Sequence, residues 1–487
     1  MLKRIKVENF KSIKKLDYTC ANLNLLMGVN GAGKSSFIQF LLLLKSLSKE
    51  PLKASVCVQD NSEKLPVKFD DVLYSYAMRP RGIMVNVEFS NRPPRGFGIL
   101  NFCRDNGRPW IGVPRELDPS DEEDRALLKD YKPRVHSVSR FIYRGEGHKD
   151  IWIEDLEYLR RCFASRQHKD LREFKEEYGD GDLIDRENDP DLYDRYCSIR
   201  DATSKNNEKI ASRINAIEKK KASDYEKLWD HMRYIEAFRE KPQEVHKGLW
   251  HGWQENELLS NGKDIVEYLY AAEEDSLKEG NPMIFPNCPD KLRLIDQVNA
   301  WLQVVSPGAQ IKISKCEVED SNQFIQSVAY GRPGCEHEFK PQSVGFGISY
   351  VLPVLVALLT AQPNDIVIIE NPEAHLHPRG QAEMGNLIAR AAAYGVQVFV
   401  ETHSDHVING VRVAVKKGIV KPDDVNIAFF ERKGHEVEAE DGSKHKEYYA
   451  DVRNIKIDAN GSLSEYPEDF LDEWSNQLLR LMKPRTK

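Results

Sequence analysis

The chain has 487 residues and a net charge of −7, and 40% of its residues are apolar while 30% are charged. This length corresponds to about three domains, or to one large domain with an insertion, and the apolar fraction is enough for a sizeable core. The negative charge excludes a globally basic nucleic-acid coat protein, so any contact with DNA or RNA must use a local basic patch.

The sequence lacks the marks of a membrane or secreted protein. The longest apolar runs, at 40–44 and 351–361, are much shorter than the roughly 20 residues that span a bilayer. The first six residues lack the apolar stretch of a signal peptide. None of the eight cysteines forms a CxxC pair, so neither a zinc site nor a disulfide framework is indicated. We therefore expect a soluble, cytoplasmic protein with no membrane partner.

The first hundred residues predict short strands around one helix. Residues 3–10 alternate between apolar and polar and predict a strand, and 23–27 predict a second strand. An apolar helix is expected from Lys34 to about Leu47. Residues 82–89 and 97–102 predict a pair of antiparallel strands.

The turn between the strand at 23–27 and this helix carries a phosphate-binding motif. Residues 28–35 read Gly-Val-Asn-Gly-Ala-Gly-Lys-Ser, the G-x-x-x-x-G-K-S pattern in the strand-to-helix setting that it needs. In such a loop, backbone N–H groups surround the β-phosphate, Lys34 reaches the β- and γ-phosphates, and the Ser35 hydroxyl is a ligand of Mg²⁺. The sequence thus predicts a nucleoside triphosphate site, without a choice between adenine and guanine, made of Asn30, Gly31, Ala32, Gly33, Lys34, Ser35 and Ser36.

The middle of the chain differs in composition from both flanks. Between residues 121 and 240 there are 29 acidic and 25 basic residues, so this segment is highly charged but nearly neutral. Residues 150–176 and 205–239 predict helices, separated by turn residues. A solvated helical insertion is the favoured interpretation, and an arm that binds a partner or follows a nucleic acid is the alternative.

The second flank alternates between helices and strands. Helices are predicted over 347–360 and 380–394, and short apolar strands over 366–369 and 396–400. Wholly apolar β-branched runs are typical of parallel strands buried on both faces. The two flanks therefore predict one α/β domain, with a mixed sheet and flanking helices, that the charged middle segment splits.

A glutamate and a histidine follow the two buried strands of this flank. Glu370 lies at the carboxyl end of its strand, where open α/β sheets bind ligands, and is expected to complete the coordination of Mg²⁺. His403 follows the next strand, and its position after a phosphate loop and an acidic strand favours a role in the site. The alternatives are an incidental glutamate and a histidine that caps a helix or fills the core.

A glycine-rich segment opens the helix at 347–360. Gly345, Gly347 and Ser349 lie at its N-terminus, which is an anion site in many proteins. Because one nucleotide does not need two such sites, we expect this one to meet the γ-phosphate held by a second copy of the chain. A glycine-rich helix start without a ligand is the alternative.

In this order, the elements resemble the ATP-binding-cassette (ABC) head of SMC-like ATPases, which include RecF-type and OLD-type proteins. The matching segments are 5–12 (first strand), 28–36 (Walker A), 234–242 (a tyrosine–arginine segment of the OLD-like branch), 345–350 (signature), 365–378 (Walker B and D-loop), His403 (switch histidine) and 455–470 (a short C-terminal domain of unknown function). The resemblance implies an ABC-type P-loop head that binds ATP and Mg²⁺ and dimerises head-to-head, as a homodimer or a higher even-numbered oligomer.

Four segments follow from the motifs and the composition. They are an N-terminal lobe at 1–105, a charged helical insertion at 106–230, a C-terminal lobe at 231–430 and a small C-terminal domain at 431–487. Only residues 404–487 follow His403, without a DxD on a buried strand, so the Toprim nuclease domain of OLD-type proteins is not expected. An effector would then be a separate chain.

Two departures from the family pattern concern catalysis. Asn371 stands where the general base usually stands, and a carboxamide cannot accept a proton at neutral pH, although it could orient a water. Glu373 is the substitute candidate for the base, beside Glu370 and His403 as the other catalytic candidates. Gly345 replaces the signature serine, so backbone amides, with Ser349, would contact the γ-phosphate. Both departures predict slow hydrolysis, with ATP acting chiefly as a dimerising switch.

Two further motifs carry weaker predictions. His375 and His377 are two residues apart without a third ligand nearby, which is a weak metal pattern, and the resemblance assigns them to the D-loop. Gln59 is the nearest candidate for a Q-loop glutamine.

The resemblance therefore implies a slowly hydrolysing ATPase that regulates a separate effector, a nuclease, in bacterial antiviral defence, because such proteins are often found in DNA-repair or antiviral-defence loci. Two alternatives stay open. One is a DNA-repair ATPase that binds DNA or RNA directly, and the other is a non-hydrolysing, nucleotide-dependent scaffold.

Overall fold

A computed structural model describes the two flanks of the chain and short parts of its middle. The described residues are 1–49, 74, 82–89, 92–100, 110–112, 142–143, 231–240, 245–249, 260–317, 323–331, 346–438, 444–471 and 473–482. The predicted helix at 150–176 and most of the predicted helix at 205–239 lie outside these residues.

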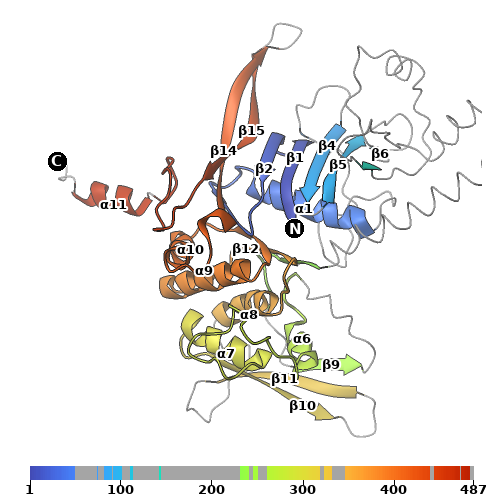
Figure 1. The fold of residues 1–487 in the computed structure, drawn as a ribbon, viewed down its shortest axis with the longest axis vertical. Coiled ribbons are helices and arrows are strands. Elements are labelled where there is room, and N and C mark those ends of the chain that lie inside the picture. The colour runs from blue at the N-terminus through green and yellow to red at the C-terminus, as the bar shows by residue number, and fades with distance from the viewer. Residues whose placement is uncertain are drawn as a thin grey trace, which may run out of the picture.

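The core sheet unites strands from both flanks (Figure 1). Its order is β15-β14-β3-β13-β12-β8, and β14, β3, β13, β12 and β8 run parallel while β15 is antiparallel to β14. The strands are β3 (Leu23–Gly28), β8 (Met232–Ile235), β12 (Ile366–Glu370), β13 (Gln397–Glu401), β14 (Val425–Glu438) and β15 (Lys444–Ile455). The pairing of β3 with β13 and β14 confirms the predicted α/β class, with a mixed sheet built from both flanks.

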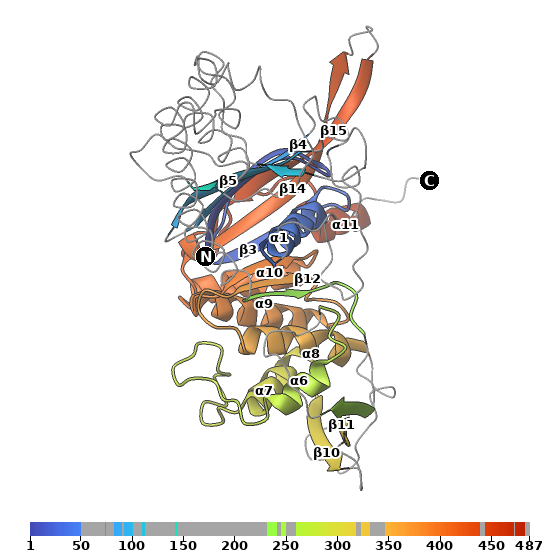
Figure 2. The same ribbon diagram turned by 90° about the vertical axis from the view of Figure 1, so that its right-hand side faces the viewer.

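Helices cover both faces of this sheet because its strands are apolar on both sides (Figure 2). In β12, Ile366 and Ile368 pack with α1 (Lys34–Lys49), while Val367 and Ile369 pack with the helices of the opposite face. Those helices are α8 (Phe346–Leu359), α9 (Pro378–Ala393) and α10 (Asp405–Lys416). The helices predicted at 34–47, 347–360 and 380–394 are thus confirmed.

A second, antiparallel sheet packs over α1. Its order is β2-β1-β4-β5-β6, with β7 paired to β5. Its strands are β1 (Leu2–Phe10), β2 (Ile13–Thr19), β4 (Gly82–Phe89), β5 (Arg92–Leu100), β6 (Trp110–Gly112) and β7 (Ile142–Tyr143). The buried Gln397 ties this sheet to the core, because its amide accepts from the Leu2 N–H at 2.8 Å and donates to the Leu2 carbonyl at 2.7 Å.

A smaller layer lies beyond α8. It contains β9 (Val245–Leu249), α6 (Ile265–Ala271), α7 (Leu294–Val305), β10 (Gln310–Glu317) and β11 (Gln323–Gly331), and α7 packs against α8 and α9. Trp301 of α7 is fully buried, and its indole donates to the Met283 carbonyl at 2.8 Å. The chain continues after α10 through η3 (Pro422–Asp424) into the last strands and α11 (Glu473–Met482).

Two predictions are corrected by the structure. The prediction of a helix over 205–239 is wrong at its C-terminal end, because Met232–Ile235 forms the strand β8 and pairs with β12. The strand predicted at 97–102 begins earlier, since β5 spans Arg92–Leu100. The strand β14 runs unbroken from the core sheet to Glu438 and crosses the domain boundary at 430, which stays a prediction.

The described part of the chain contains no helix that is both long and apolar enough to cross a membrane.

Candidate nucleotide site

The phosphate loop leaves β3 in a conformation that only glycine adopts easily. Gly28 and Gly33 have φ angles of +133° and +114°. A Cβ at Gly28 would lie 2.1 Å from the Phe430 carbonyl oxygen, and one at Gly33 would lie 2.6 Å from the Ala450 Cβ. The turn is therefore held against β14 and β15, and α1 begins at Lys34 as the motif predicts.

Lys34 bonds to its own loop. Its side chain is 3% exposed, and Nζ donates to the carbonyls of Gly28 at 2.8 Å and Val29 at 3.1 Å. Burial lowers the pKa of Lys34, and the Glu401 carboxylate, 3.8 Å away, opposes that shift. The ammonium group thus lies at the mouth of the turn that is expected to receive phosphates.

The other loop residues divide by exposure. Asn30, Gly31 and Ser35 are exposed, while Ala32 is buried. The Ser36 hydroxyl accepts a hydrogen bond from the Ser12 hydroxyl at 2.9 Å, which ties the start of α1 to the turn between β1 and β2. The exposed residues can therefore meet a ligand directly, whereas Ser36 holds the loop in place.

Glu401 is a site residue that the sequence analysis missed. It ends β13 beside Glu370, which ends β12, and the two are register partners. The Ser35 hydroxyl donates to Glu401, with its Oγ 3.3 Å from each carboxylate oxygen. Burial raises the pKa of Glu401 to about 7, and the charge of Glu370 adds to the shift. The available signal was the position of Glu401, which ends an apolar strand just as Glu370 does.

Glu370 is held by the edge strand of the sheet. The Tyr234 hydroxyl of β8 donates to Glu370 Oε1 at 3.0 Å. Burial raises the pKa of Glu370, and the bond from Tyr234 opposes that shift. Ser35 and Glu370, which were predicted to hold Mg²⁺ together, are thus bonded to Glu401 and Tyr234 instead of to each other.

The oxygen atoms gathered here suit a hard cation. Hydroxyl and carboxylate oxygens are the ligands that Mg²⁺ prefers, and Mg²⁺ usually keeps several waters and substrate phosphates besides one or two protein ligands. Ser35 and Glu370 provide two such oxygen ligands, and Glu401 lies beside both of them. Within the described ranges, no three His, Cys, Asp or Glu side chains form a site that could hold a metal without these additional ligands.

Asn371 and Glu373 have different surroundings. Asn371 has a φ of +45°, its N–H donates to the Glu401 carbonyl at 2.8 Å, and its buried Oδ1 has no hydrogen-bond partner. Both oxygens of Glu373 are used, because they accept from the Thr402 hydroxyl at 2.8 Å and from the His403 N–H at 2.9 Å. Glu373 therefore fixes the segment that carries His403.

The segment after β13 is anchored at both ends. Ser404 caps α10 by accepting from the Val407 N–H at 3.1 Å, so His403 stands between a bonded Thr402 and a helix cap. The imidazole is exposed, and partial burial and the nearby Lys34 charge lower the pKa of His403. The structure thus brings His403 to the same sheet edge as Lys34 and the carboxylates.

The signature helix packs against the predicted D-loop. A Cβ on Gly347 would lie 2.9 Å from the His375 carbonyl oxygen, and the rings of Tyr350 and His375 meet edge-to-face at 4.6 Å. Ser349 is 2% exposed, so its hydroxyl lies inside the protein. His377 caps α9 by accepting from the Arg379 N–H at 3.4 Å. Gly345 and Gln59 lie outside the described residues.

Arg239 connects this helix to the strand end at Glu370. Its side chain is buried, and it donates to the carbonyls of Tyr350 at 3.1 Å, Asn371 at 3.4 Å and Glu370. Burial lowers the pKa of Arg239 to about 10, which still leaves it charged at neutral pH. Only the family resemblance pointed to this residue, because its partners are carbonyls of distant segments.

Replacing Arg239 by methionine is expected to lower the free energy of unfolding by about 2 kcal/mol, because buried carbonyls lose a charged donor. Urea denaturation followed by circular dichroism measures the change. Arg453→Met is the matched control. Arg453 is 43% exposed and pairs with Glu431 and Glu465, so its loss is expected to cost much less, because water screens exposed ion pairs. Equal losses in the two variants would contradict the assigned role.

Comparison with known proteins gives two family matches. The sequence profile of the AAA ATPase domain family matches residues 1–408, and that of a protein family of unknown function, DUF3696, matches 420–481. The second match confirms the predicted C-terminal segment of unknown function. No curated protein matches the chain.

Solved SMC heads were also found, with low similarity. The Smc head of Pyrococcus furiosus, bound to the C-terminal domain of ScpA, is 13% identical, with 99% of each chain covered and a TM-score of 0.39. A second SMC head, bound to the C-terminal winged-helix domain of ScpA, is 11% identical over 94% of this chain and 98% of that chain, with a TM-score of 0.40. The SMC head of Thermotoga maritima is 9% identical over 94% and 99%, with a TM-score of 0.36.

The family match spans Lys34, the carboxylates at the ends of β12 and β13, and His403. On this match, which covers most of its length, the chain belongs to the AAA ATPase domain family.

Proposed function

We propose that this protein binds ATP with Mg²⁺ at residues 28–36 and hydrolyses it slowly. The observation that carries the proposal is the meeting of Lys34, Ser35 and Glu401 at the carboxyl end of the sheet, where Nζ lies 3.8 Å and Oγ 3.3 Å from the same carboxylate. An ammonium, a hydroxyl and a carboxylate at a phosphate loop are the groups that phosphoryl transfer requires.

The residues of the chain would change partners when the nucleotide binds. Loop N–H groups donate to phosphate oxygens, and Lys34 exchanges the Gly28 and Val29 carbonyls for phosphate oxygens. Ser35 would exchange Glu401 for Mg²⁺, which would neutralise phosphate charge when bound. Glu401 then loses its hydrogen bond from Ser35.

We assign the role of proton acceptor to Glu401. Asn371 has no basic group, Glu373 is engaged by Thr402 and His403, and Glu370 is engaged by Tyr234. This assignment replaces the earlier choice of Glu373, which instead positions the His403 segment.

We further propose that two copies close head-to-head around ATP, and that closure controls a separate effector chain, a nuclease in antiviral defence. The order of sequence motifs, which resembles that of SMC-like heads, supports this part. Arg239 provides a link for it, because it joins the Tyr350 carbonyl of the signature helix to the strand end at Glu370. A movement of α8 would therefore shift the strand end that carries Glu370, next to Glu401.

The test is a titration with ATP in the presence of Mg²⁺ or EDTA. Wild type is expected to bind ATP more tightly with Mg²⁺, to release phosphate and to double its mass in light scattering. Ser35→Ala is expected to lose the effect of Mg²⁺ while it still binds ATP. Absence of ATP binding at millimolar concentrations would refute the proposal, and binding without a change in mass would refute its dimeric part.

A further inference from the structure

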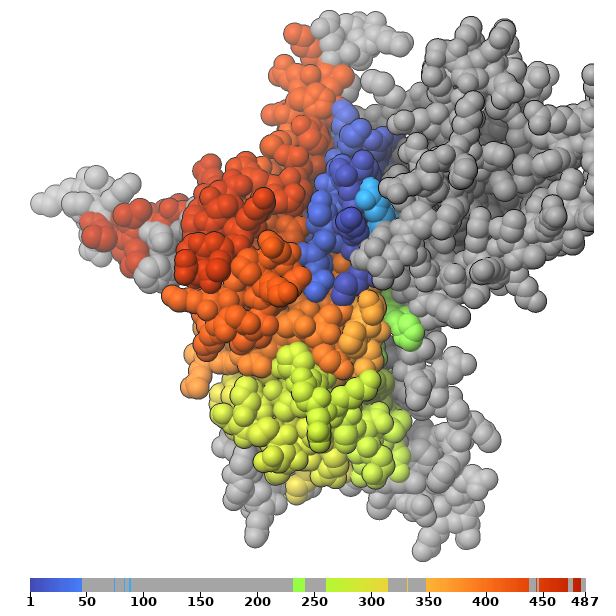
Figure 3. All heavy atoms as spheres, viewed as in Figure 1, coloured from blue at the N-terminus to red at the C-terminus, as the bar shows by residue number. Residues whose placement is uncertain are grey.

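The last two strands of the core sheet form a wall beside the phosphate loop. The pairing of β14 with β3 ends at Phe430 and Gly28, and residues 431–438 continue past the end of β3. Figure 3 shows the C-terminal residues, in orange and red, lying directly against the blue N-terminal residues. The two-stranded ribbon of β14 and β15 therefore borders the edge of the core sheet at which the phosphate loop turns.

Close contacts fix the ribbon against both ends of the loop. A Cβ at Gly28 would strike the Phe430 carbonyl oxygen, and one at Gly33 would strike Ala450. The Ala450 N–H donates to the Ser12 carbonyl at 2.8 Å, so β15 also contacts the turn between β1 and β2. The segment after residue 408, outside the AAA match, thus builds one side of the nucleotide site.

The face of the ribbon that meets Gly33 continues outward with two exposed side chains. Arg432 lies opposite Ala450, and Tyr448 lies opposite Gly434. Side chains two residues apart on a strand share a face and are about 7 Å apart. Tyr448 is therefore the next side chain of β15 beyond Ala450 on this face, one step past the loop.

These two side chains form a stacked pair. The Arg432 guanidinium carbon lies 4.4 Å from the centre of the Tyr448 ring, and the Lys446 Nζ lies 5.5 Å from it. The ring lies across Gly434, where a Cβ would meet ring carbons at 2.9 and 3.0 Å. Tyr448 is 39% exposed. Aromatic rings and guanidinium planes are the groups on which nucleobases stack.

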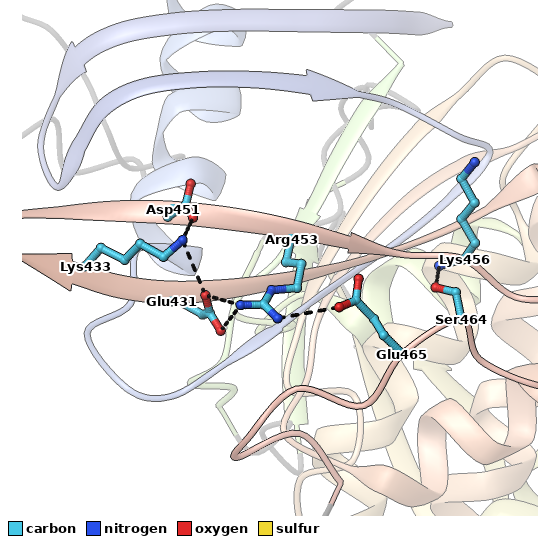
Figure 4. A network of polar contacts seen from close by, with 7 residues as sticks. All are labelled: Glu431, Lys433, Asp451, Arg453, Lys456, Ser464 and Glu465. Atoms are coloured by element: carbon cyan, nitrogen blue, oxygen red, sulfur yellow. Dashed lines mark hydrogen bonds and ion pairs between the residues drawn. The ribbon is translucent and has the colours of Figure 1, made fainter.

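The opposite face of the ribbon carries a chain of ion pairs. Figure 4 shows Glu431, Lys433, Asp451 and Arg453 in a chain of ion pairs that reaches Glu465 of the C-terminal segment. These groups hold the segment after β15 to the ribbon. Charges on this face therefore serve the fold, and the Tyr448 face is the one that borders the site.

We propose that Tyr448 and Arg432 form a platform for the purine base of the nucleotide whose phosphates occupy residues 28–36. The inference rests on the proposed ATP site and adds the residues that recognise its base. It gives the C-terminal segment a direct part in nucleotide binding, since the phosphates meet the loop and the base meets the ribbon.

The test compares ATP with inorganic tripolyphosphate, which has the phosphates but no base. Tyr448→Ala is expected to weaken ATP binding about tenfold and to leave tripolyphosphate binding unchanged, because only stacking is lost. Tyr448→Phe, which keeps the ring, is expected to bind ATP as wild type does. Tyr466→Ala is the matched control, because Tyr466 is an exposed tyrosine, at 60%, of the same segment. It is expected to bind both ligands as wild type does.

The outcomes separate the two proposals. Unchanged ATP affinity in Tyr448→Ala, or an equal loss for both ligands, overturns the platform while the phosphate site stands. The same holds if wild type binds tripolyphosphate as tightly as ATP. If wild type binds neither ligand, the phosphate site itself is refuted, and the platform with it.

Discussion

Alanine at position 34 is expected to lower the affinity for ATP at least about 100-fold, which corresponds to about 2.7 kcal/mol. The ammonium of Lys34 is the one cationic side chain of the 28–36 loop, and its charge-assisted bonds to phosphate have no replacement in the variant. The fold should be kept, since Lys34 bonds only to two carbonyls of its own turn and lies near Glu401. Isothermal titration calorimetry with ATP and Mg²⁺ measures the change.

Lys416→Ala controls for the loss of a positive charge, because Lys416 lies exposed in the last turn of α10. It is expected to bind ATP as wild type does. A Lys34→Ala protein with a native circular dichroism spectrum and undiminished ATP affinity would show that the loop is not the nucleotide site.

Glutamine at position 401 is expected to retain ATP binding and to reduce phosphate release at least about 100-fold, because the proton acceptor is lost. Single-turnover phosphate release, with ATP affinity measured in parallel, separates the two effects. Glu373→Gln is the comparison, since Glu373 holds Thr402 and His403 by hydrogen bonds that a carboxamide can partly keep. Turnover lost in Glu373→Gln and kept in Glu401→Gln would return the base assignment to Glu373.

The same variant has a pH signature in the nucleotide-free protein. The pKa of Glu401 rises from 4.5 to about 7 on folding. Between those values the folded protein keeps a proton that the unfolded chain has released, so the stability of wild type falls as the pH rises through this range. Glutamine has no proton to lose, and the variant is therefore expected to be more stable at pH 8 by about 3 kcal/mol.

Urea denaturation in EDTA at pH 5 and pH 8 measures this difference. Glu465→Gln, at an exposed ion pair, serves as the control and is expected to follow the wild-type profile. A Glu401→Gln protein with the same pH dependence as wild type would exclude the raised pKa.

Local patterns were sufficient for the elements that bind phosphate. The G-x-x-x-x-G-K-S motif and the apolar run of β12 define Lys34 and Glu370 without knowledge of the fold, because each depends on a few neighbouring residues. The strand β8 was predicted as helix because its four residues follow a long charged segment, and only pairing with β12 selects the extended form.

Pairing across the chain explains the other omissions. Glu401 enters the site because β13 lies between β3 and β12, which is a property of the sheet order. Arg239 was indicated only by the family resemblance, because it is bonded to carbonyls more than a hundred residues away in sequence, and carbonyls carry no sequence signal. The contact between Ala450 and Gly33 also joins residues far apart in sequence. The position of the β14–β15 ribbon beside the loop could therefore not be predicted from residue patterns.

The position of β3 between β13 and β14 also sets the order of events during synthesis. The phosphate loop leaves the ribosome early, but its supporting strand has neither neighbour until residues 397–430 have been made, and Ala450 follows 417 residues after Gly33. At about 5–20 residues per second, this delay is roughly 20 to 80 s. Until then β3 has two unpaired edges, which invite pairing with other nascent chains. A chain interrupted before β15 would carry the complete Walker A motif and still lack a finished nucleotide site.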